Sequence, residues 1–584
     1  TSARQLTRRK LLGGAGAGFV GLAAAGLVGC GGGSRPAPQT ASSPADEPTV
    51  PAPSPTATAT PPPRTGGTAR LLSPRTFSFD TLDTLRSGDV STLEVLARAH
   101  SRLIQWTDFE RPSLGPDLAA SWEQPDPETW LLRLDPAARW HPRPPLDGRA
   151  VTATDVVAHF ERAIALAKAV RLPSVQRPQD LASIRRVSSP GPGLVRIDLS
   201  RPDPFLPLTL AARFALVQAP EAVESFEKSW HEGRPAQVAG SGPFILGTMD
   251  PGRRLVFSAH LAGHRPPRVD GLEVLAPVAA IDLFREKRLD ETICLDRREA
   301  PALRAAFTGE VVERGRFREE AIISTLFVGA PPWDDARLVR ALSGALNRVG
   351  IARDLFGGRA IASGPVPPPP GLSPGEAARR AGYEMDADAA GREAKALWDA
   401  AGGASLGTVT IDFPSIFDPL YSASSFVTAR LNAILGPQFR PAVETYTTIS
   451  KKAVEHRYGN GTPAFWFGWG PPFVEPDPSR WLIETYASDG SGFATTGFAS
   501  STVDTLLKGL GQEMSLAARA PIVSQVQDEL LAAGGGGILT WAIQRDEHFR
   551  WAYLQGRAPT PWPSQHLDAS IALDPGHATF ATRP

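Results

Sequence analysis

The hydrophobic pattern of the chain changes its period between residues 129 and 164. Thr129–Leu134 places a Trp and two Leu at every second position, which predicts a half-buried strand. An Asp-Gly turn follows, and Thr152 with Asp155 forms a capping box, which marks the first turn of a helix. Apolar residues then recur with helical spacing at Val156, Val157, Phe160 and Ile164. A helix is therefore predicted to begin at about Ala153.

Two further segments of the chain have helical periodicity. After Asp335, one apolar stripe comprises Leu338, Leu342, Leu346 and Val349. Ser501 with Asp504 is predicted to cap another helix. The apolar face of that helix comprises Val503, Leu506, Leu507 and Leu510. Together with the strand pattern, these helices predict a mixed α/β fold.

The first 29 residues have the pattern of an export signal. A twin-arginine n-region, Arg8 and Arg9 followed by Lys10, precedes an apolar run that is rich in Gly and Ala and has no acidic residue. The run ends in Leu-Val-Gly-Cys at residues 27–30, which resembles the bacterial lipoprotein box. A membrane-spanning helix is the alternative, although the many glycines make the run weakly hydrophobic. We predict a signal peptide over 1–29 and acyl chains on Cys30 that anchor the protein to a membrane.

The composition changes sharply after the cysteine. Residues 30–67 are mainly Gly, Pro, Ala, Ser and Thr, and they offer almost no apolar surface to bury. Such a segment stays extended, so it is predicted to be a linker, with the globular body beginning near Thr68. An exported, tethered protein has no access to cytosolic ATP or reduced nicotinamide, which excludes chemistry that consumes them.

Charge and cysteine content exclude further classes of protein. The 61 Lys and Arg residues balance 61 Asp and Glu residues, so no overall field favours a nucleic acid partner. The chain has only two cysteines, which rules out a disulfide framework. Cys294 lies in an apolar, strand-like run and is predicted to be a core residue and not a nucleophile.

The common catalytic signatures are missing from the sequence. There is no His-Glu-x-x-His motif, no Gly-x-Ser-x-Gly elbow and no phosphate-binding Gly-Lys-Ser/Thr loop. His260 and His264 have the spacing of two metal ligands on a helix, but Gly263 and two following prolines interrupt it, and a surface loop is expected there. We therefore expect no enzymatic activity, no cofactor and no metal.

Several separated motifs resemble the bacterial extracellular solute-binding proteins of family 5, the dipeptide, oligopeptide and nickel receptors of ABC importers. In chain order they are Leu118–Glu123, Trp130–Leu134, Ala138–His141, Asp147–Arg162, Gly240–Phe244, Arg268–Glu273, Asp335–Leu342 with Asn347-Arg348, Pro476–Pro478 and Thr502–Leu507. The resemblance covers nearly the whole chain after the linker.

This resemblance implies a periplasmic binding protein-like II fold of two hinged lobes, with an extra subdomain on the first lobe (the cluster C type). The positions of the motifs give the expected boundaries: lobe I over 68–101, 236–325 and 538–584, the extra subdomain over 102–235, and lobe II over 326–537. The chain is expected to cross into lobe II near Phe327 and to return near Leu539.

The function implied by the resemblance is capture without chemistry. A solute bound between the lobes favours the closed state, and the closed form docks on the permease. The expected partners are a peptide or similar organic solute, the permease and ATPase subunits of an ABC importer, and the outer face of the cell membrane through the lipid anchor. We expect a monomer. Two alternatives remain open: a ligand sensor or folding factor with the same fold, and a secreted hydrolase.

The expected solute site lies around residue 470. In peptide-binding relatives an aspartate shortly before the Asp-Pro motif pairs with the free amine of the peptide, and here its position falls on Val474, with Glu475 beside it. This departure leaves unblocked peptides, blocked peptides, sugars and other organic solutes open. The predicted ligand-binding residues are Trp469, Gly470, Trp466, Phe473, Val474, Glu475, Trp541 and Phe79. The competing interpretation is that the alternating residues Phe465, Phe467 and Trp469 fill a core.

Overall fold

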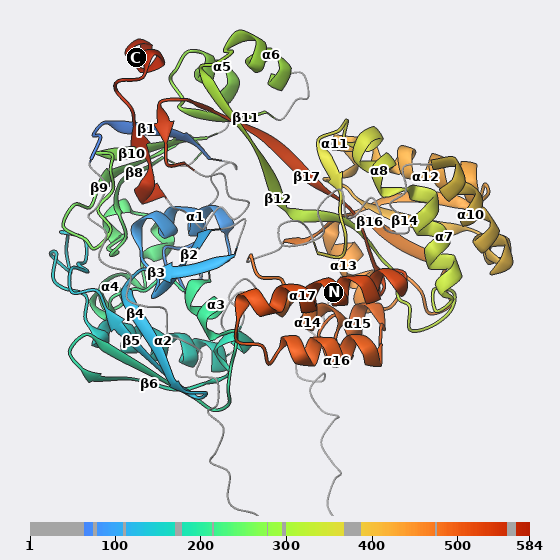
Figure 1. The fold of residues 1–584 in the computed structure, drawn as a ribbon, viewed down its shortest axis with the longest axis horizontal. Coiled ribbons are helices and arrows are strands. Elements are labelled where there is room, and N and C mark those ends of the chain that lie inside the picture. The colour runs from blue at the N-terminus through green and yellow to red at the C-terminus, as the bar shows by residue number, and fades with distance from the viewer. Residues whose placement is uncertain are drawn as a thin grey trace, which may run out of the picture. The chain divides into compact units, whose positions relative to one another are not determined.

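A computed structural model describes most of the chain from Arg64 onward (Figure 1). The described residues are 64–73, 79–108, 112–169, 178–212, 215–250, 252–276, 278–294, 299–366, 387–472, 476–557 and 568–584. The predicted signal peptide, Cys30 and the linker up to residue 63 lie outside them. None of the helices in these ranges is long and apolar enough to cross a membrane.

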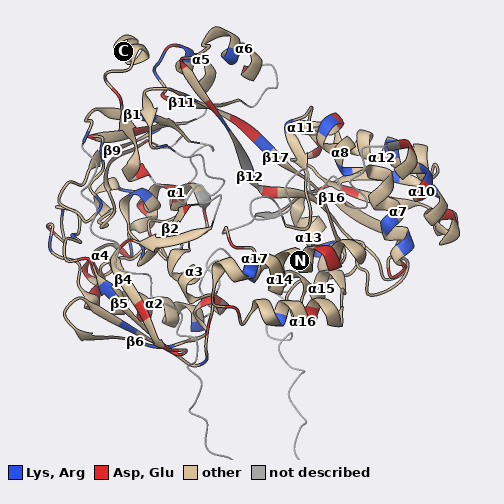
Figure 2. Cartoon of the chain, in the orientation of Figure 1, with Lys and Arg blue, Asp and Glu red and all other residues tan. Residues whose placement is uncertain are grey.

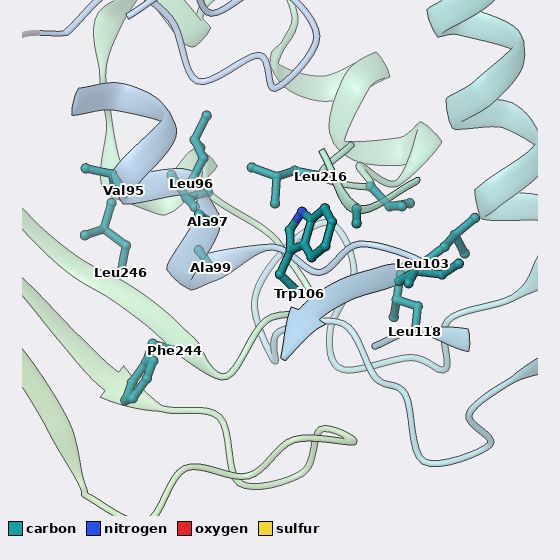
Figure 3. Close-up of a cluster of buried hydrophobic side chains, with 14 of the residues drawn as sticks. Val95, Leu96, Ala97, Ala99, Leu103, Trp106, Leu118, Leu216, Phe244 and Leu246 are labelled. Atoms are coloured by element: carbon teal, nitrogen blue, oxygen red, sulfur yellow. The ribbon is translucent and has the colours of Figure 1, made fainter. Parts of the chain in front are cut away.

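A four-stranded sheet contains the first described strand and three strands from residues 244–275. Its order is β1 (Thr68–Leu72), β10 (Gly271–Leu275), β9 (Arg254–Ala259), β8 (Phe244–Asp250). β1 is parallel to β10, and the other neighbours are antiparallel. Helix α1 (Val90–Ala99), which Asp89 caps by accepting a hydrogen bond from the Thr92 amide, packs near this sheet and near Trp106 on β2 (Ile104–Asp108), as Figure 3 shows.

A second four-stranded sheet holds the region in which the sequence predicted a strand and a helix. Its order is β4 (Ala119–Asp126), β5 (Thr129–Leu134), β7 (Leu194–Leu199), β6 (Ile184–Gly191), and α2 (Ala153–Lys168) packs on it. Strand β5 and the start of α2 confirm the sequence predictions. The capping box is also confirmed, because the Asp155 amide donates to Thr152 Oγ1 and the Thr152 amide donates to Asp155 Oδ2.

One seven-stranded sheet joins distant parts of the chain. Six of its strands run in the order β11 (Glu291–Cys294), β17 (Ile538–Trp551), β12 (Val311–Thr325), β16 (Ala464–Pro472), β14 (Val409–Pro414), β15 (Phe439–Glu444), and β13 (Ala360–Ala362) pairs with β17. The long strands β12 and β17 run antiparallel side by side (Figure 1). Their register shifts between residues 317 and 321 and again between Ile322 and Ile323, and β12 pairs with β16 from Glu320 onward.

The long helices form two groups: three pack into the core around the strands paired beyond residue 320, and three pack against one another in a separate core. They are α7 (Ala336–Leu346), α10 (Ala387–Ala400), α12 (Ala423–Leu435), α14 (Ser479–Tyr486), α16 (Ser501–Leu510) and α17 (Leu516–Ala532). The apolar stripe predicted for α7 is confirmed at Leu338, Leu342 and Leu346, which are buried. The predicted cap of α16 was wrong by one residue. Ser500 caps the helix, and Asp504 instead accepts hydrogen bonds from the amide and hydroxyl of Ser488.

Shorter elements connect these layers. They are β3 (Ser113–Pro116), β18 (Leu554–Gln555), β19 (Ala572–Leu573), α3 (Leu206–Ala211), α4 (Pro220–Phe226), α5 (Ala280–Arg285), α6 (Glu299–Ala306), α8 (Arg348–Gly350), α11 (Asp418–Tyr421), α13 (Tyr446–Val454) and α15 (Phe493–Thr496). Figure 2 shows acidic and basic residues interspersed along the chain, as expected from the balanced composition.

Buried side chains form separate cores. The first core combines residues from both four-stranded sheets, so the predicted first lobe and its extra subdomain share it. The second core lies around β12, β14, β16 and the helices α7 and α12, and a third joins α14, α16 and α17. The predicted lobes, the extra subdomain and their boundaries stay predictions.

Candidate functional site

Trp469, on β16, is a half-buried tryptophan whose ring is held on several sides. Its indole Nε1 donates a hydrogen bond of 2.9 Å to Oε1 of Gln544 on β17, and Nε2 of Gln544 donates one of 2.8 Å to the hydroxyl of Tyr421. The ring lies edge-on to Phe417 at 5.0 Å and to Tyr421 at 5.9 Å between centroids. Its orientation is therefore fixed before any solute arrives.

Tyr446, at the start of α13, secures the backbone of the same strand. Its hydroxyl donates a hydrogen bond of 3.0 Å to the carbonyl oxygen of Trp469. Burial raises the pKa of Tyr446 well above its usual range, so the hydroxyl stays protonated at neutral pH and remains a donor.

Charged groups lie beside this aromatic cluster, at the register shift of β12. Arg318 Nε is 3.1 and 3.2 Å from the two carboxylate oxygens of Asp546 on β17. Burial opposes the charge on Arg318, but attraction to Asp546, with smaller contributions from Tyr421 and Glu320, raises its pKa. Glu320 pairs in register with Pro472 on β16, two residues before Val474. Asp546 and Glu320 thus bring two carboxylates to the same corner as the Arg318 guanidinium.

The glycines around Trp469 serve strand packing. A Cβ on Gly470 would lie 2.9 Å from Cδ1 of Ile323, and one on Gly468 would lie 2.8 Å from Cδ of Pro414. Because the neighbours of Gly470 belong to the sheet, the close approach that this residue permits is between strands. Phe465 and Phe467 are buried in the second core, as the competing interpretation of this strand expected.

Trp466 and Trp541, two other predicted ligand-binding residues, are buried. Trp466 is 8% exposed and belongs to a small cluster with Ile449 and Tyr458. Trp541 has no exposed surface, and its Nε1 donates a hydrogen bond of 2.9 Å to Ser324 Oγ. The expectation that Trp541 faces a solute is therefore corrected, because its ring packs within the core, stacked on Phe467.

The remaining predicted site residues lie elsewhere. Phe79 is half-buried against the first core, with its ring beside Gly233. Phe473, Val474 and Glu475 lie outside the described residues. Of the predicted set, the structure brings Trp469, Gly470 and Trp466 onto one strand.

Sequence reasoning missed most of the neighbours of Trp469. Phe417, Tyr421, Tyr446 and Gln544 come from three separate segments, and none belongs to a recognisable motif. The sheet register and two short helices bring them together, so no local signal in the sequence identifies them.

The two histidines that resembled a metal site flank a surface turn, but their rings are buried. His260 is 2% exposed, and its Nδ1 is 3.1 Å from the carbonyl oxygen of Gly242. His264 Nε2 is 2.9 Å from Asp117 Oδ1. The expected surface loop is confirmed, because residues 261–264 form a turn in which Leu261 is 50% exposed, but both histidine rings point inward and contact a backbone carbonyl and a carboxylate. No group of three or more possible metal-ligating side chains occurs in the described ranges.

Cys294, at the end of β11, is confirmed as a core residue. It is 1% exposed, and burial raises the pKa of its thiol to about 12. A thiol that stays protonated at neutral pH is a poor nucleophile.

Comparison with known proteins now identifies the class that this fold and site define. The model of the middle region of the bacterial extracellular solute-binding proteins, family 5, matches residues 113–491. The chain therefore belongs to this family, whose members bind solutes and are not enzymes.

Two curated relatives match parts of the chain. A putative ABC transporter peptide-binding protein of Brucella ovis is 29% identical over 259 residues, which are 42% of this chain and 45% of that protein. The HTH-type transcriptional regulator SgrR of Pectobacterium atrosepticum is 33% identical over 108 residues, 18% of this chain and 16% of that protein. The matched regions thus span less than half the length of either relative.

A solved structure matches over a larger share. The periplasmic binding protein DppA from Helicobacter pylori, in complex with the peptide STSA, has a TM-score of 0.66 at 16% identity, and the match covers 88% of this chain and 99% of that one. The structure therefore has the mixed α/β periplasmic binding-protein fold that the sequence predicted.

Proposed function

We propose that the protein is the extracytoplasmic solute-binding receptor of an ABC importer. Family membership and the matched fold support this function, and the names of the Brucella relative and of DppA both concern peptide binding. The observation that carries the proposal is the Trp469 cluster, in which a half-buried indole is fixed by Gln544 and lies beside charged residues.

The solute site is proposed to centre on Trp469, with Tyr421, Tyr446 and Phe417 as its aromatic neighbours. A rigid aromatic ring covers apolar parts of a solute at little entropic cost, and it accepts varied side chains because the contact is not directional. Phe473, Val474 and Glu475 continue the same chain segment and are proposed to complete the site. Trp541 is not included, because its ring is buried.

Glu320 is proposed to pair with a cationic group of the solute. Burial is the main reason that the pKa of Tyr446 is raised, and the charge of Glu320 adds to it. The same charge helps to raise the pKa of Arg318, so the Glu320 carboxylate lies within electrostatic range of both side chains. Strand pairing places it opposite Pro472, close in sequence to Val474, where the peptide-binding pattern has an aspartate. A protonated amine taken out of water requires a charged partner, and a carboxylate on the neighbouring strand supplies one. A peptide with a free amine is therefore the favoured solute.

Identification of the retained solute tests this function directly. Native mass spectrometry of the purified full-length protein is expected to show bound peptides as a ladder of masses above that of the free chain. A glycan or metal mass would contradict the peptide assignment, and turnover of a chromogenic ester or peptide would contradict the receptor function itself.

The anchor is proposed to be a diacylated Cys30. The basic n-region, the Leu-Val-Gly-Cys tetrapeptide and the linker that follows support it. One acyl chain binds a membrane only marginally, whereas two hold a protein firmly. In cells fed labelled palmitate, the native protein is expected to take up label and to partition into detergent, and Cys30→Ser is expected to do neither. Label on the Cys30→Ser protein would contradict the anchor.

A further inference from the structure

Phe205, at the N-terminus of α3, lies between two arginines that come from a distant part of the chain. The guanidinium carbon of Arg519 is 4.7 Å from the centre of its ring, and that of Arg480 is 5.5 Å away. Phe205 belongs to the region predicted as the extra subdomain, whereas both arginines belong to the region predicted as lobe II. The contact therefore bridges two regions that the sequence assigns to different bodies.

Arg519, on α17, pairs with an aspartate of its own region and donates a hydrogen bond to the region predicted as the extra subdomain. Its Nη1 is 2.5 Å from Asp477 Oδ2, and its Nη2 donates a hydrogen bond of 2.7 Å to the carbonyl oxygen of Pro204. The side chains of Arg519 and Asp477 are 3% and 4% exposed. Its Nε also donates to the carbonyl oxygen of Glu513 at 2.9 Å, so the charge is neutralised within lobe II while Nη2 donates across the contact.

Arg480, on α14, is neutralised from the opposite side. Its Nη1 is 2.6 Å from Asp180 Oδ2, and its Nη2 donates to the carbonyl oxygen of Phe205 at 3.0 Å and to Thr209 Oγ1 at 2.9 Å. Its side chain is 8% exposed and that of Asp180 is 3% exposed. This ion pair exists only while the two regions touch.

Both surfaces are ordered by their own residues. Asp203 accepts hydrogen bonds from the Phe205 amide at 2.8 Å and from the Ser183 hydroxyl at 2.5 Å, which fixes the turn that presents the Pro204 and Phe205 carbonyls.

Across the contact, Asp477 Oδ1 accepts from the amide and hydroxyl of Ser479, which leaves Oδ2 for Arg519. Little reorganisation is needed to form the contact.

The energetics of such a contact suit reversible association. Burying the Arg480–Asp180 pair removes two charges from water, and their attraction largely offsets that penalty without exceeding it by much. Arginine over an aromatic face gains strength when it is desolvated, and the fork of guanidinium donors demands one geometry. The contact is therefore specific in geometry and modest in net strength, because separation returns both charges to water.

We propose that Asp180, Phe205, Asp477, Arg480 and Arg519 form a latch that holds the extra subdomain against lobe II in the closed receptor. This goes beyond the proposed function, because the latch sets the ratio of closed to open molecules for any solute and touches none. Weakening it lowers apparent affinity by the factor by which the closed form is depleted.

Distance measurement by pulsed electron paramagnetic resonance tests the latch without a ligand. Spin labels are placed at Arg185→Cys on β6 and Lys508→Cys on α16, two exposed positions on either side of the contact, in a Cys30→Ser background. Cys294 is buried and stays unlabelled.

Asp180→Asn and Phe205→Ala are expected to shift a substantial part of the distance distribution to longer values. Asp250→Asn, which alters an exposed carboxylate 3.7 Å from Arg253, is the matched control and is expected to leave the distribution unchanged.

Phe205→Leu keeps the apolar bulk of the side chain but removes its aromatic face. It replaces Asp180→Asn and Phe205→Ala as the test variant if those proteins fail to fold. It is expected to give a smaller shift in the same direction, with cooperative thermal unfolding retained. An unchanged distribution in folded Asp180→Asn or Phe205→Leu protein would overturn the latch and would show that the two regions form one rigid body.

Discussion

Trp469 and Gln544 are joined by a hydrogen bond of 2.9 Å that links the indole on β16 to a side chain on β17, although β12 lies between the two strands in the sheet. The bond spans a strand because both side chains stand on the same face, and it fixes the ring at the point where the long strands change register.

Replacement of Trp469 by Ala should weaken solute binding specifically. Loss of a central aromatic contact in a binding site typically costs about 10- to 100-fold in affinity. Trp122→Ala is the matched control, because Trp122 on β4 is also a partly buried tryptophan but packs against the first core. Isothermal titration with the solute identified by mass spectrometry should show the affinity loss only for Trp469→Ala, while both variants lose comparable thermal stability. Equal affinities for the two variants would place the solute elsewhere.

Glu320→Gln should reduce discrimination in favour of a free amine. The native protein is expected to bind trialanine more tightly than N-acetyltrialanine, and the variant should bind both with similar, weak affinity, since a carboxylate-to-ammonium hydrogen bond contributes about 1.5–3 kcal/mol. Glu310→Gln, just before β12 and 3.7 Å from Lys287, changes charge by the same amount and should retain the preference. Retained preference in Glu320→Gln would assign amine recognition to another group.

Buried histidines should make the fold sensitive to acid. Burial lowers the pKa of His100 to about 4, and burial with the nearby charges of Arg162 and His100 lowers that of His159 to about 3. An unfolded histidine has a pKa of about 6.5, so the stabilisation from each neutral ring is complete above pH 6.5 and declines as the pH falls through the range down to the folded value. The contribution of each ring to the free energy of unfolding should fall by about 1.6 kcal/mol between pH 6.5 and 5.

Urea unfolding at these two pH values measures that loss. His159→Gln should show a smaller pH dependence than the native protein, and His231→Gln, which alters an exposed histidine, should show the native dependence. An unchanged slope in His159→Gln would mean that this ring is not the source of the acid sensitivity.

Two glycines should respond in opposite ways to alanine. A Cβ on Gly240 would lie 1.9 Å from the carbonyl oxygen of Ala99, so Gly240→Ala should destabilise the fold by at least about 3 kcal/mol through overpacking. Gly509, inside α16, has open space where a Cβ would stand, so Gly509→Ala should stabilise it by about 0.5–1 kcal/mol. Thermal unfolding measures both, and a tolerated Gly240→Ala would contradict the close contact.

Local sequence determined the elements whose signals are local. The capping box of Thr152 and Asp155 and the strand at Thr129–Leu134 depend on neighbours within a few residues, and both were predicted correctly. The stripe on α7 was correct for its three leucines, but the helix ends at Leu346, so Val349 lies on α8 instead. The cap of α16 was misassigned by one residue because two adjacent serines, Ser500 and Ser501, are equally plausible caps in the sequence. Only the structure shows that Asp504 accepts a hydrogen bond from the Ser488 hydroxyl instead.

Tertiary structure decided which aromatic residues are accessible. Trp469 and Trp541 were both predicted to bind the solute, yet Trp469 is half-buried, whereas Trp541 is fully buried and donates a hydrogen bond to Ser324. Accessibility depends on the register of strands far apart in the chain, and so does the meeting of Phe205 with Arg480 and Arg519. The family and its fold were therefore determined by the sequence alone, whereas the composition of the site and of the latch was decided by packing, because long-range strand and helix contacts leave no local pattern.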